Sequence, residues 1–109
     1  MCRSPSNVRE PTVSTLSTSV TVVIPAYNSA RFLPAVVASV ERQTVPVDQI
    51  VVVNDGSTDD TDRIAAELGA RVDYIRQPNR GVSVARNAGL TVARGGLVLF
   101  LDADDSLTP

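Results

Sequence analysis

Three carboxylates follow an apolar run near the end of the chain, and their spacing is typical of a metal site. Leu97 to Leu101 are all apolar, and Asp102, Asp104 and Asp105 come directly after them. Carboxylates this close repel one another, which raises their pKa values unless a cation neutralises them. Oxygen ligands suit Mg²⁺ or Mn²⁺, which take the rest of their shell from water and substrate phosphates. We therefore predict a metal–diphosphate site here; the alternative is a polar turn.

Other side chains suited to binding a nucleotide follow further apolar runs. Asp55, next to Gly56, is able to accept a hydrogen bond from a base N–H or a ribose hydroxyl, and Tyr27 is able to stack on a base. Arg86 carries the planar fork that clamps a phosphate, and the N–H groups of the helix after Gly81 favour an anion. Each has a plainer alternative: a cap or turn for Asp55, packing for Tyr27, and an exposed helix position for Arg86.

Composition excludes several other kinds of chemistry. The 109 residues contain no His and a single Cys, Cys2, which rules out catalytic triads, zinc–histidine sites and a disulfide framework. The net charge is −2, and two Tyr and two Phe are the only aromatic residues, so we expect no nucleic-acid partner. Any catalysis must therefore depend on carboxylates, a metal ion and arginine.

Apolar periodicity predicts the elements that position these residues. Apolar or β-branched runs predict four strands, and stripes at helical spacing predict three helices. In chain order they are a strand at 20–24, a helix at 31–43, a strand at 50–53, a helix at 57–68, a strand at 72–75, a helix at 82–93 and a strand at 97–101. Ser57 and Asp60 have the spacing of a capping box for the second helix, and the last strand reads as buried on both faces.

Alternation of strands and helices predicts a parallel α/β sheet with helices on both faces. Right-handed crossovers favour a Rossmann-like strand order of 3-2-1-4, with ligands bound at the carboxyl ends of the strands. The polar clusters around Tyr27, Asp55 and Asp102 all follow such ends. We therefore expect them to converge on one crevice.

The first nineteen residues differ from the rest. Residues 1–19 are rich in Ser, Thr and Pro and lack the apolar run of a signal peptide, so we interpret them as a flexible leader before a domain at 20–109. No segment has the roughly 20 apolar residues that span a bilayer. We accordingly expect no membrane segment in this chain and a cytoplasmic location.

Four motifs together resemble family 2 glycosyltransferases of the GT-A fold. They are Pro25-x-Tyr27-Asn28, Val53-Asn54-Asp55-Gly56-Ser57-Thr58-Asp59, Asn79-x-Gly81 with Ala85-Arg86-Asn87-x-Gly89, and Phe100-Leu101-Asp102-Ala103-Asp104-Asp105. They occur in the family's order and spacing over residues 20–108. One departure is Asn54, where many relatives carry a second aspartate.

The resemblance implies a UDP-, dTDP- or GDP-sugar donor and Mn²⁺ or Mg²⁺ as cofactor. It implies that Pro25 and Tyr27 line the nucleoside pocket and that Asp55 holds the base. Asp102 and Asp104 match the Asp-x-Asp motif, in which Asp102 would contact the ribose or sugar and Asp104 the metal. Transfer to an acceptor hydroxyl would follow, with the metal stabilising the departing diphosphate.

The matched motifs cover the donor-binding half of such a domain. In the family, the general base and the acceptor-binding half lie beyond the Asp-x-Asp motif, whereas this sequence ends at Pro109. We therefore expect a truncated GT-A domain, and a nucleotide-binding fragment without catalytic activity is one alternative. Another is a haloacid-dehalogenase-type phosphatase, with Asp102 as nucleophile and Asp104 as acid. A Rossmann dehydrogenase is excluded because no Gly-x-Gly-x-x-Gly follows the first strand.

Overall fold

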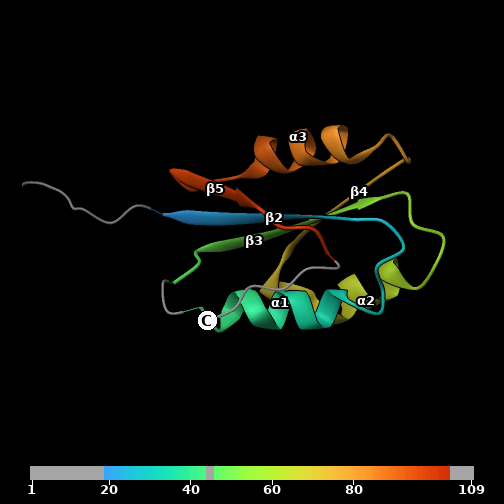
Figure 1. Cartoon of the computed structure of the whole chain (residues 1–109), viewed down its shortest axis with the longest axis horizontal. Coiled ribbons are helices and arrows are strands. Elements are labelled where there is room, and N and C mark those ends of the chain that lie inside the picture. Colours follow the sequence, from blue (N-terminus) through green and yellow to red (C-terminus); the bar gives the residue numbers. More distant parts are fainter. Residues whose placement is uncertain (1–18, 44–45, 104–109) are drawn as a thin grey trace, which may run out of the picture.

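A parallel sheet runs through the part of the chain that the structure, a computed structural model, describes: residues 19–43 and 46–103 (Figure 1). Strands and helices alternate along it. In chain order they are β2 (Val20–Ala26), α1 (Leu33–Glu41), β3 (Gln49–Asp55), α2 (Thr61–Leu68), the 3₁₀ turn η2 (Gly69–Arg71), β4 (Asp73–Gln77), α3 (Val82–Val92) and β5 (Leu97–Phe100). Every predicted strand and helix is therefore present, with ends that differ by a few residues.

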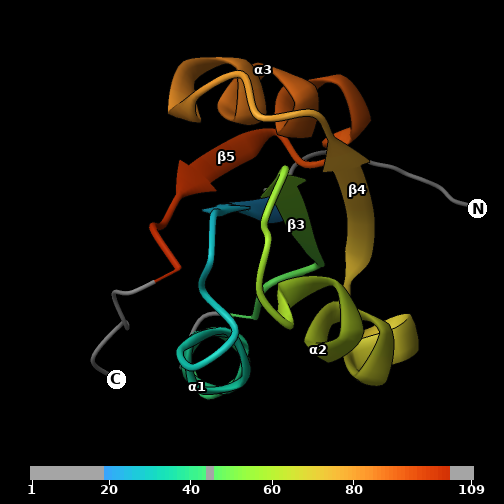
Figure 2. The ribbon, with the colours of Figure 1, turned by 90° about the vertical axis from the view of Figure 1, so that its right-hand side faces the viewer.

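The sheet has the predicted Rossmann-like topology. Its strand order is β4-β3-β2-β5, which is 3-2-1-4 when the described strands are counted along the chain, and all three pairings are parallel. Helix α3 covers one face, and α1 and α2 cover the other (Figure 2). Because all strands run the same way, their carboxyl ends lie at one edge of the sheet, where the loops after β2 and β3 meet.

Two apolar layers hold the helices on the sheet. The larger one lies between the sheet and α1 with α2, and includes Ile24 and Val52 from the strands and Leu33 from α1. The smaller one, under α3, packs Ala85 against Val23 and its neighbours. Both central strands are buried on both faces, which is why they read as continuous Val and Ile runs.

The two central strands are longer than predicted. β2 continues through Pro25 to Ala26, although proline has no N–H to donate. The residue two before it, Val23, turns its C=O toward β5 and accepts from the N–H of Leu101, and strand pairing with β5 ends there. In a strand, the N–H and C=O groups of every second residue point to the same side, so the nitrogen of Pro25 points to the same side as the C=O of Val23. The pairing with β5 has already ended there, so the missing N–H of Pro25 costs no hydrogen bond between strands.

Helix α2 begins later than predicted because its expected cap is used elsewhere. The helix starts at Thr61, and neither Ser57 nor Asp60 forms the predicted capping box. The N–H of Ser57 donates to the side-chain oxygen of Asn54 at 2.9 Å, and the Ser57 hydroxyl accepts from the N–H of Asn28 at 2.9 Å. These contacts hold residues 57–60 as a loop between β3 and α2.

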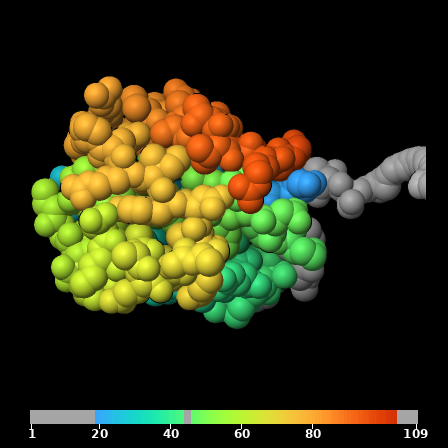
Figure 3. Space-filling model, turned by 180° about the vertical axis from the view of Figure 1, so that it is seen from behind, coloured from blue at the N-terminus to red at the C-terminus, as the bar shows by residue number. Residues whose placement is uncertain are grey.

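β5 departs from the prediction that it is buried on both faces. Leu97, Leu99 and Phe100 are each more than 40% exposed. β5 pairs only with β2 in the described sheet, and it lies at the border of the molecule beside the start of β2 (Figure 3). In the described sheet β5 therefore has a neighbouring strand on one side only, whereas β2 and β3 each have a strand on both sides. Among the described residues, no helix has the length and apolar character needed to cross a bilayer.

Candidate functional site

A pocket of about 300 Å³ opens at the carboxyl ends of β2 and β3. This volume is at the lower end of the range for small-molecule sites. Its lining comes from the end of β2, the end of β3 and the start of α3: Pro25, Ala26, Tyr27, Asp55, Asn79, Gly81, Val82 and Ala85. Most of the lining surface is apolar, and Asp55 is the one charged residue among these. The structure therefore brings Pro25, Tyr27 and Asp55 together in one site.

Asp55 is the last residue of β3 and is only 5% exposed. Its Oδ1 accepts hydrogen bonds from Gln77 Nε2 at 2.9 Å and from the N–H of Arg80 at 2.8 Å, and its Oδ2 accepts from the N–H of Gly81 at 2.9 Å. Burial alone would raise the pKa of Asp55, but these three hydrogen bonds outweigh it and lower the pKa. The side chain is a charged, fixed acceptor at neutral pH.

The loop before α3 is fastened to the end of β3. The side-chain amide of Asn79 donates to the backbone oxygen of Asp55 at 3.1 Å. Gly56 has a φ of +72°, and a Cβ placed there would lie 2.5 Å from the backbone nitrogen of Asn79. Only glycine allows this approach together with this backbone conformation. The close contact keeps the N–H groups of Arg80 and Gly81 on Asp55.

Asn28 joins the loop after β2 to the loop after β3. It has a φ of +50°, and its Oδ1 accepts from the N–H groups of Thr58 at 2.8 Å and Asp59 at 3.2 Å. Its own N–H donates to Ser57 Oγ at 2.9 Å. Because Tyr27 is the preceding residue, these contacts fix where Tyr27 leaves the sheet.

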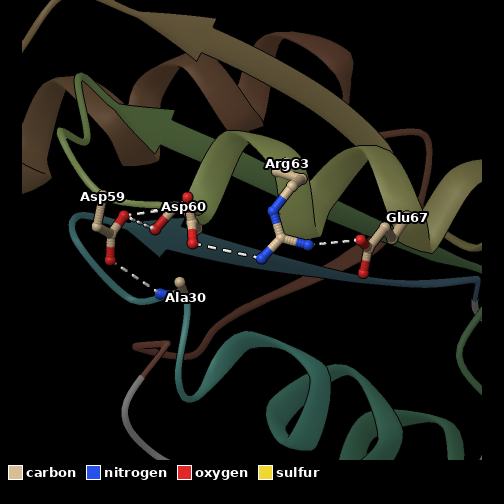
Figure 4. A network of polar contacts seen from close by, with 6 residues as sticks. Ala30, Asp59, Asp60, Arg63 and Glu67 are labelled. Carbon is tan, nitrogen blue, oxygen red and sulfur yellow. Dashed lines mark hydrogen bonds and ion pairs between the residues drawn. The ribbon is translucent and has the colours of Figure 1, made fainter.

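Further contacts connect the same two loops (Figure 4). Asp59 Oδ2 accepts from the N–H of Ala30 at 3.3 Å, and the N–H of Ser29 donates to Thr61 Oγ1 at 2.9 Å. Beyond them on α2, Arg63 pairs with Asp60 and Glu67 on the surface. The exposed ion pairs contribute little to stability, whereas the backbone contacts tie the segment after β2 to the start of α2.

Tyr27 stands at the pocket rim with 51% of its surface exposed. An aromatic ring packed for stability would be covered, so the packing alternative has no support here. The ring is free to lie against a flat ligand in the pocket.

Arg86, on α3, and Asp102, two residues after the end of β5, lie side by side outside the pocket lining. Their nearest side-chain atoms, Arg86 Nη2 and Asp102 Oδ1, are 3.8 Å apart, and both side chains are about half exposed. The guanidinium carbon of Arg86 lies 5.9 Å from the centre of the Phe100 ring. Arg86 Nε is buried with no hydrogen-bond partner among the described residues. Arg86 is therefore neither a fully solvated side chain nor fully paired.

Of the three carboxylates predicted to surround the metal–diphosphate site, the structure describes only Asp102. Asp104, the predicted metal ligand, lies outside the described residues, as does Asp105. Among residues 19–43 and 46–103, no three His, Cys, Asp or Glu side chains cluster closely enough to hold a metal ion. The described residues thus offer one carboxylate at the end of β5.

A second pocket, of about 190 Å³, lies at the opposite, amino-terminal edge of the strands. Four of its charged side chains form ion pairs, Arg71 with Glu41 and Arg94 with Asp73, and Asp48 accepts from the N–H of Val20. None of the predicted site residues lines it.

Sequence reasoning missed the residues that hold Asp55 in place. Gln77 lies near the end of a short strand and Arg80 acts through its backbone, so neither side-chain type gave a signal. The Asn28 contacts were also missed, because Asn28 was considered only as part of the Pro25-x-Tyr27-Asn28 motif. Its position after a strand and before a helix, combined with a residue type that tolerates positive φ, was the available signal.

A parallel sheet of this order with a pocket at the carboxyl ends of its central strands defines an α/β ligand-binding unit. Residues 21–109 match the model of glycosyl transferase family 2. The chain belongs to this family. This family membership argues against the alternative that the chain is a haloacid-dehalogenase-type phosphatase.

Curated relatives are glycosyltransferases. The chain is 44% identical over 89 residues to glycosyltransferase GlyA of Streptococcus pneumoniae, an alignment that covers 79% of this chain and 13% of that protein. It is 40% identical over 93 residues to a chondroitin synthase of Escherichia coli, covering 83% of this chain and 14% of the relative. The chain thus spans a small part of the length of these relatives.

Solved structures of GT-A glycosyltransferases share the fold. Residues 1–349 of S. aureus TarS in complex with UDP-GlcNAc superpose with a TM-score of 0.70 at 32% identity, covering 81% of this chain and 27% of that TarS chain. The mannosyltransferase PcManGT of Pyrobaculum calidifontis, in complex with GDP-Man and Mn²⁺, gives a TM-score of 0.73 at 30% identity, covering 87% and 30%. The predicted N-terminal half of a GT-A fold is confirmed by these partial matches.

Proposed function

We propose that the pocket at the carboxyl ends of β2 and β3 binds the nucleoside of a nucleotide-sugar donor, in a protein that transfers the sugar to an acceptor hydroxyl. The observation that carries this proposal is the convergence of Pro25, Tyr27 and Asp55 on one pocket. The sugar nucleotides bound by TarS and PcManGT support it.

Each pocket residue has a distinct part in holding the nucleoside. Tyr27, exposed at the rim, stacks on the base, while Pro25 and Ala85 provide apolar surface beneath it. Asp55, kept ionised by three donors, accepts a hydrogen bond from a base N–H. A ligand N–H that meets this buried carboxylate gains a charge-assisted hydrogen bond.

We infer that Arg86 and Asp102 hold the diphosphate and the sugar. Arg86 follows Ala85 of the pocket lining, carries an unpartnered Nε and lies beside Asp102. A planar guanidinium in this position is suited to a bidentate contact with phosphate. We propose that Asp102 contacts the ribose or sugar.

Mn²⁺ or Mg²⁺ fits this arrangement as a cofactor. Asp102 offers one half-exposed oxygen donor, and such ions take most of their remaining ligands from water and substrate phosphates. We propose that Asp104 holds the ion, beside Asp102 at the end of β5. When bound, it supplies Lewis-acid stabilisation of the leaving diphosphate. The cytoplasmic location remains a prediction.

Thermal melting with added nucleotide tests the proposal. UDP or GDP with Mn²⁺ should raise the melting temperature, and excess EDTA should reverse the part of the shift that depends on metal. Tyr27→Ala should weaken nucleotide binding at least about fivefold, because a base–aromatic stack is lost. Phe32→Ala is the matched control, since Phe32 is also exposed but lies outside the pocket. No shift with either nucleotide, or equal effects of the two substitutions, contradicts the proposed function.

A further inference from the structure

The hydrogen bonds already made by Asp55 limit which base the pocket accepts. The relatives leave this open, because TarS was solved with UDP-GlcNAc and PcManGT with GDP-Man. This inference rests on the proposed function and concerns the base edge that Asp55 reads.

A carboxylate oxygen has two acceptor positions, so a carboxylate offers four in all. Both positions of Asp55 Oδ1 are filled, by Gln77 Nε2 at 2.9 Å and the N–H of Arg80 at 2.8 Å. Oδ2 receives one bond, from the N–H of Gly81 at 2.9 Å. Among the described residues no other donor reaches the carboxylate, so one position on Oδ2 remains for a ligand.

The carboxylate is also prevented from turning to free a second position. Two of its three donors are backbone N–H groups of the loop before α3, and that loop contacts Gly56 at the position where a Cβ would lie 2.5 Å from Asn79. Rotating the side chain would break these bonds at a site that is only 5% exposed. Water cannot readily replace the lost partners there.

Base edges differ in the number of donors that they present to such a group. Uracil and thymine have a single N–H between two carbonyl groups. Guanine has two adjacent donors, N1–H and the 2-amino group, which pair together with both oxygens of a free carboxylate. With one acceptor left, Asp55 satisfies the single donor of uracil fully but leaves one guanine donor without a partner.

We propose that Asp55, with Oδ1 saturated by Gln77 and Arg80, makes this pocket selective for uracil- or thymine-containing donors over guanine-containing ones. A buried donor without a partner weakens binding substantially, so UDP should bind roughly tenfold or more tightly than GDP. Gln77 is a specificity-determining residue of the site because it fills one of the two Oδ1 positions.

Isothermal titration of UDP and GDP, each with Mg²⁺, tests the inference. Wild-type protein should prefer UDP, and Gln77→Ala, which frees one Oδ1 position and the space beside it, should bring the ratio closer to one. Arg76→Ala is the matched control on the same strand, because Arg76 pairs with Asp62 and not with Asp55.

The outcomes separate the two proposals. Equal affinities, a preference for GDP, or a preference that Gln77→Ala leaves unchanged would overturn the selectivity inference while the proposed function stands. Binding of neither nucleotide would overturn the proposed function and the inference together.

Discussion

Replacing Gly56 with alanine perturbs the contact that links the end of β3 to the loop before α3. Gly56 has a φ of +72°, and a Cβ there would lie 2.5 Å from the Asn79 nitrogen and 3.0 Å from its Cα. Both neighbouring atoms belong to the backbone, so they cannot move aside as a flexible side chain does. Gly56→Ala must therefore shift the loop.

The expected cost has two parts. An L-residue in the left-handed conformation costs about 1–2 kcal/mol. Inserting a methyl group into a closely packed contact costs about 1–3 kcal/mol more. The free energy of unfolding should therefore fall by about 2–5 kcal/mol in Gly56→Ala, the sum of these two ranges.

Gly69→Ala is the matched control. Gly69 has a φ of +56° but no atom within 4 Å of a Cβ placed there, so this substitution carries the backbone strain without the contact. With a ψ of −129°, the Gly69 backbone lies outside the left-handed helical region, in a conformation that L-residues rarely adopt, so the cost should be about 1–3 kcal/mol. Urea unfolding of both variants, with a common m-value, gives the two free energies.

The nucleotide should distinguish the two variants as well. Moving Asn79 draws the N–H groups of Arg80 and Gly81 away from Asp55. UDP affinity should fall severalfold in Gly56→Ala and stay unchanged in Gly69→Ala. If both variants lose equal stability and bind UDP equally, the close approach at Gly56 does not hold the site together, and the reasoning is refuted.

Three further predictions concern other contacts. Asn28→Gly keeps positive φ accessible but removes the oxygen that accepts from Thr58; melting and UDP titration should show lower stability, by about 1–2 kcal/mol, and weaker binding. Burial and the Asp62 hydrogen bond raise the pKa of Tyr74, so its stabilisation is complete below pH ~10 and lost at higher pH; Tyr74→Phe should flatten that part of a urea-unfolding pH series. Three hydrogen bonds lower the pKa of Asp55 against the opposing effect of burial, so its contribution should be lost as pH falls below about 4, and Asp55→Asn should lack this acid-side loss.

The sheet and its order were predictable because the strands carry strong periodic signals. Continuous runs such as Ile50 to Val53 have to be buried on both faces, and alternation with amphipathic helices leaves few topologies. β5 shows the limit of this reasoning, since an apolar run does not say which neighbours cover it. In the described chain Leu97 and Phe100 remain exposed.

The site was predictable in its residue types and less so in its contacts. Tyr27 and Asp55 follow strands and so were assigned to one edge, where the structure places them. The partners of Asp55 come from residues 22–26 positions further along the chain, two of them through backbone N–H groups. Backbone donors carry no sequence signal, so the saturation of Oδ1 is visible only in three dimensions.

An NMR titration of the ¹⁵N-labelled chain with UDP and Mg²⁺ tests the central claim most directly, because it locates the ligand residue by residue. We expect saturable shifts at the amides of Tyr27, Asp55 and Gly81, around the pocket at the carboxyl ends of β2 and β3. Shifts confined to the opposite edge, at Asp73 and Arg94, or no shifts at all, would contradict a nucleotide site in this pocket.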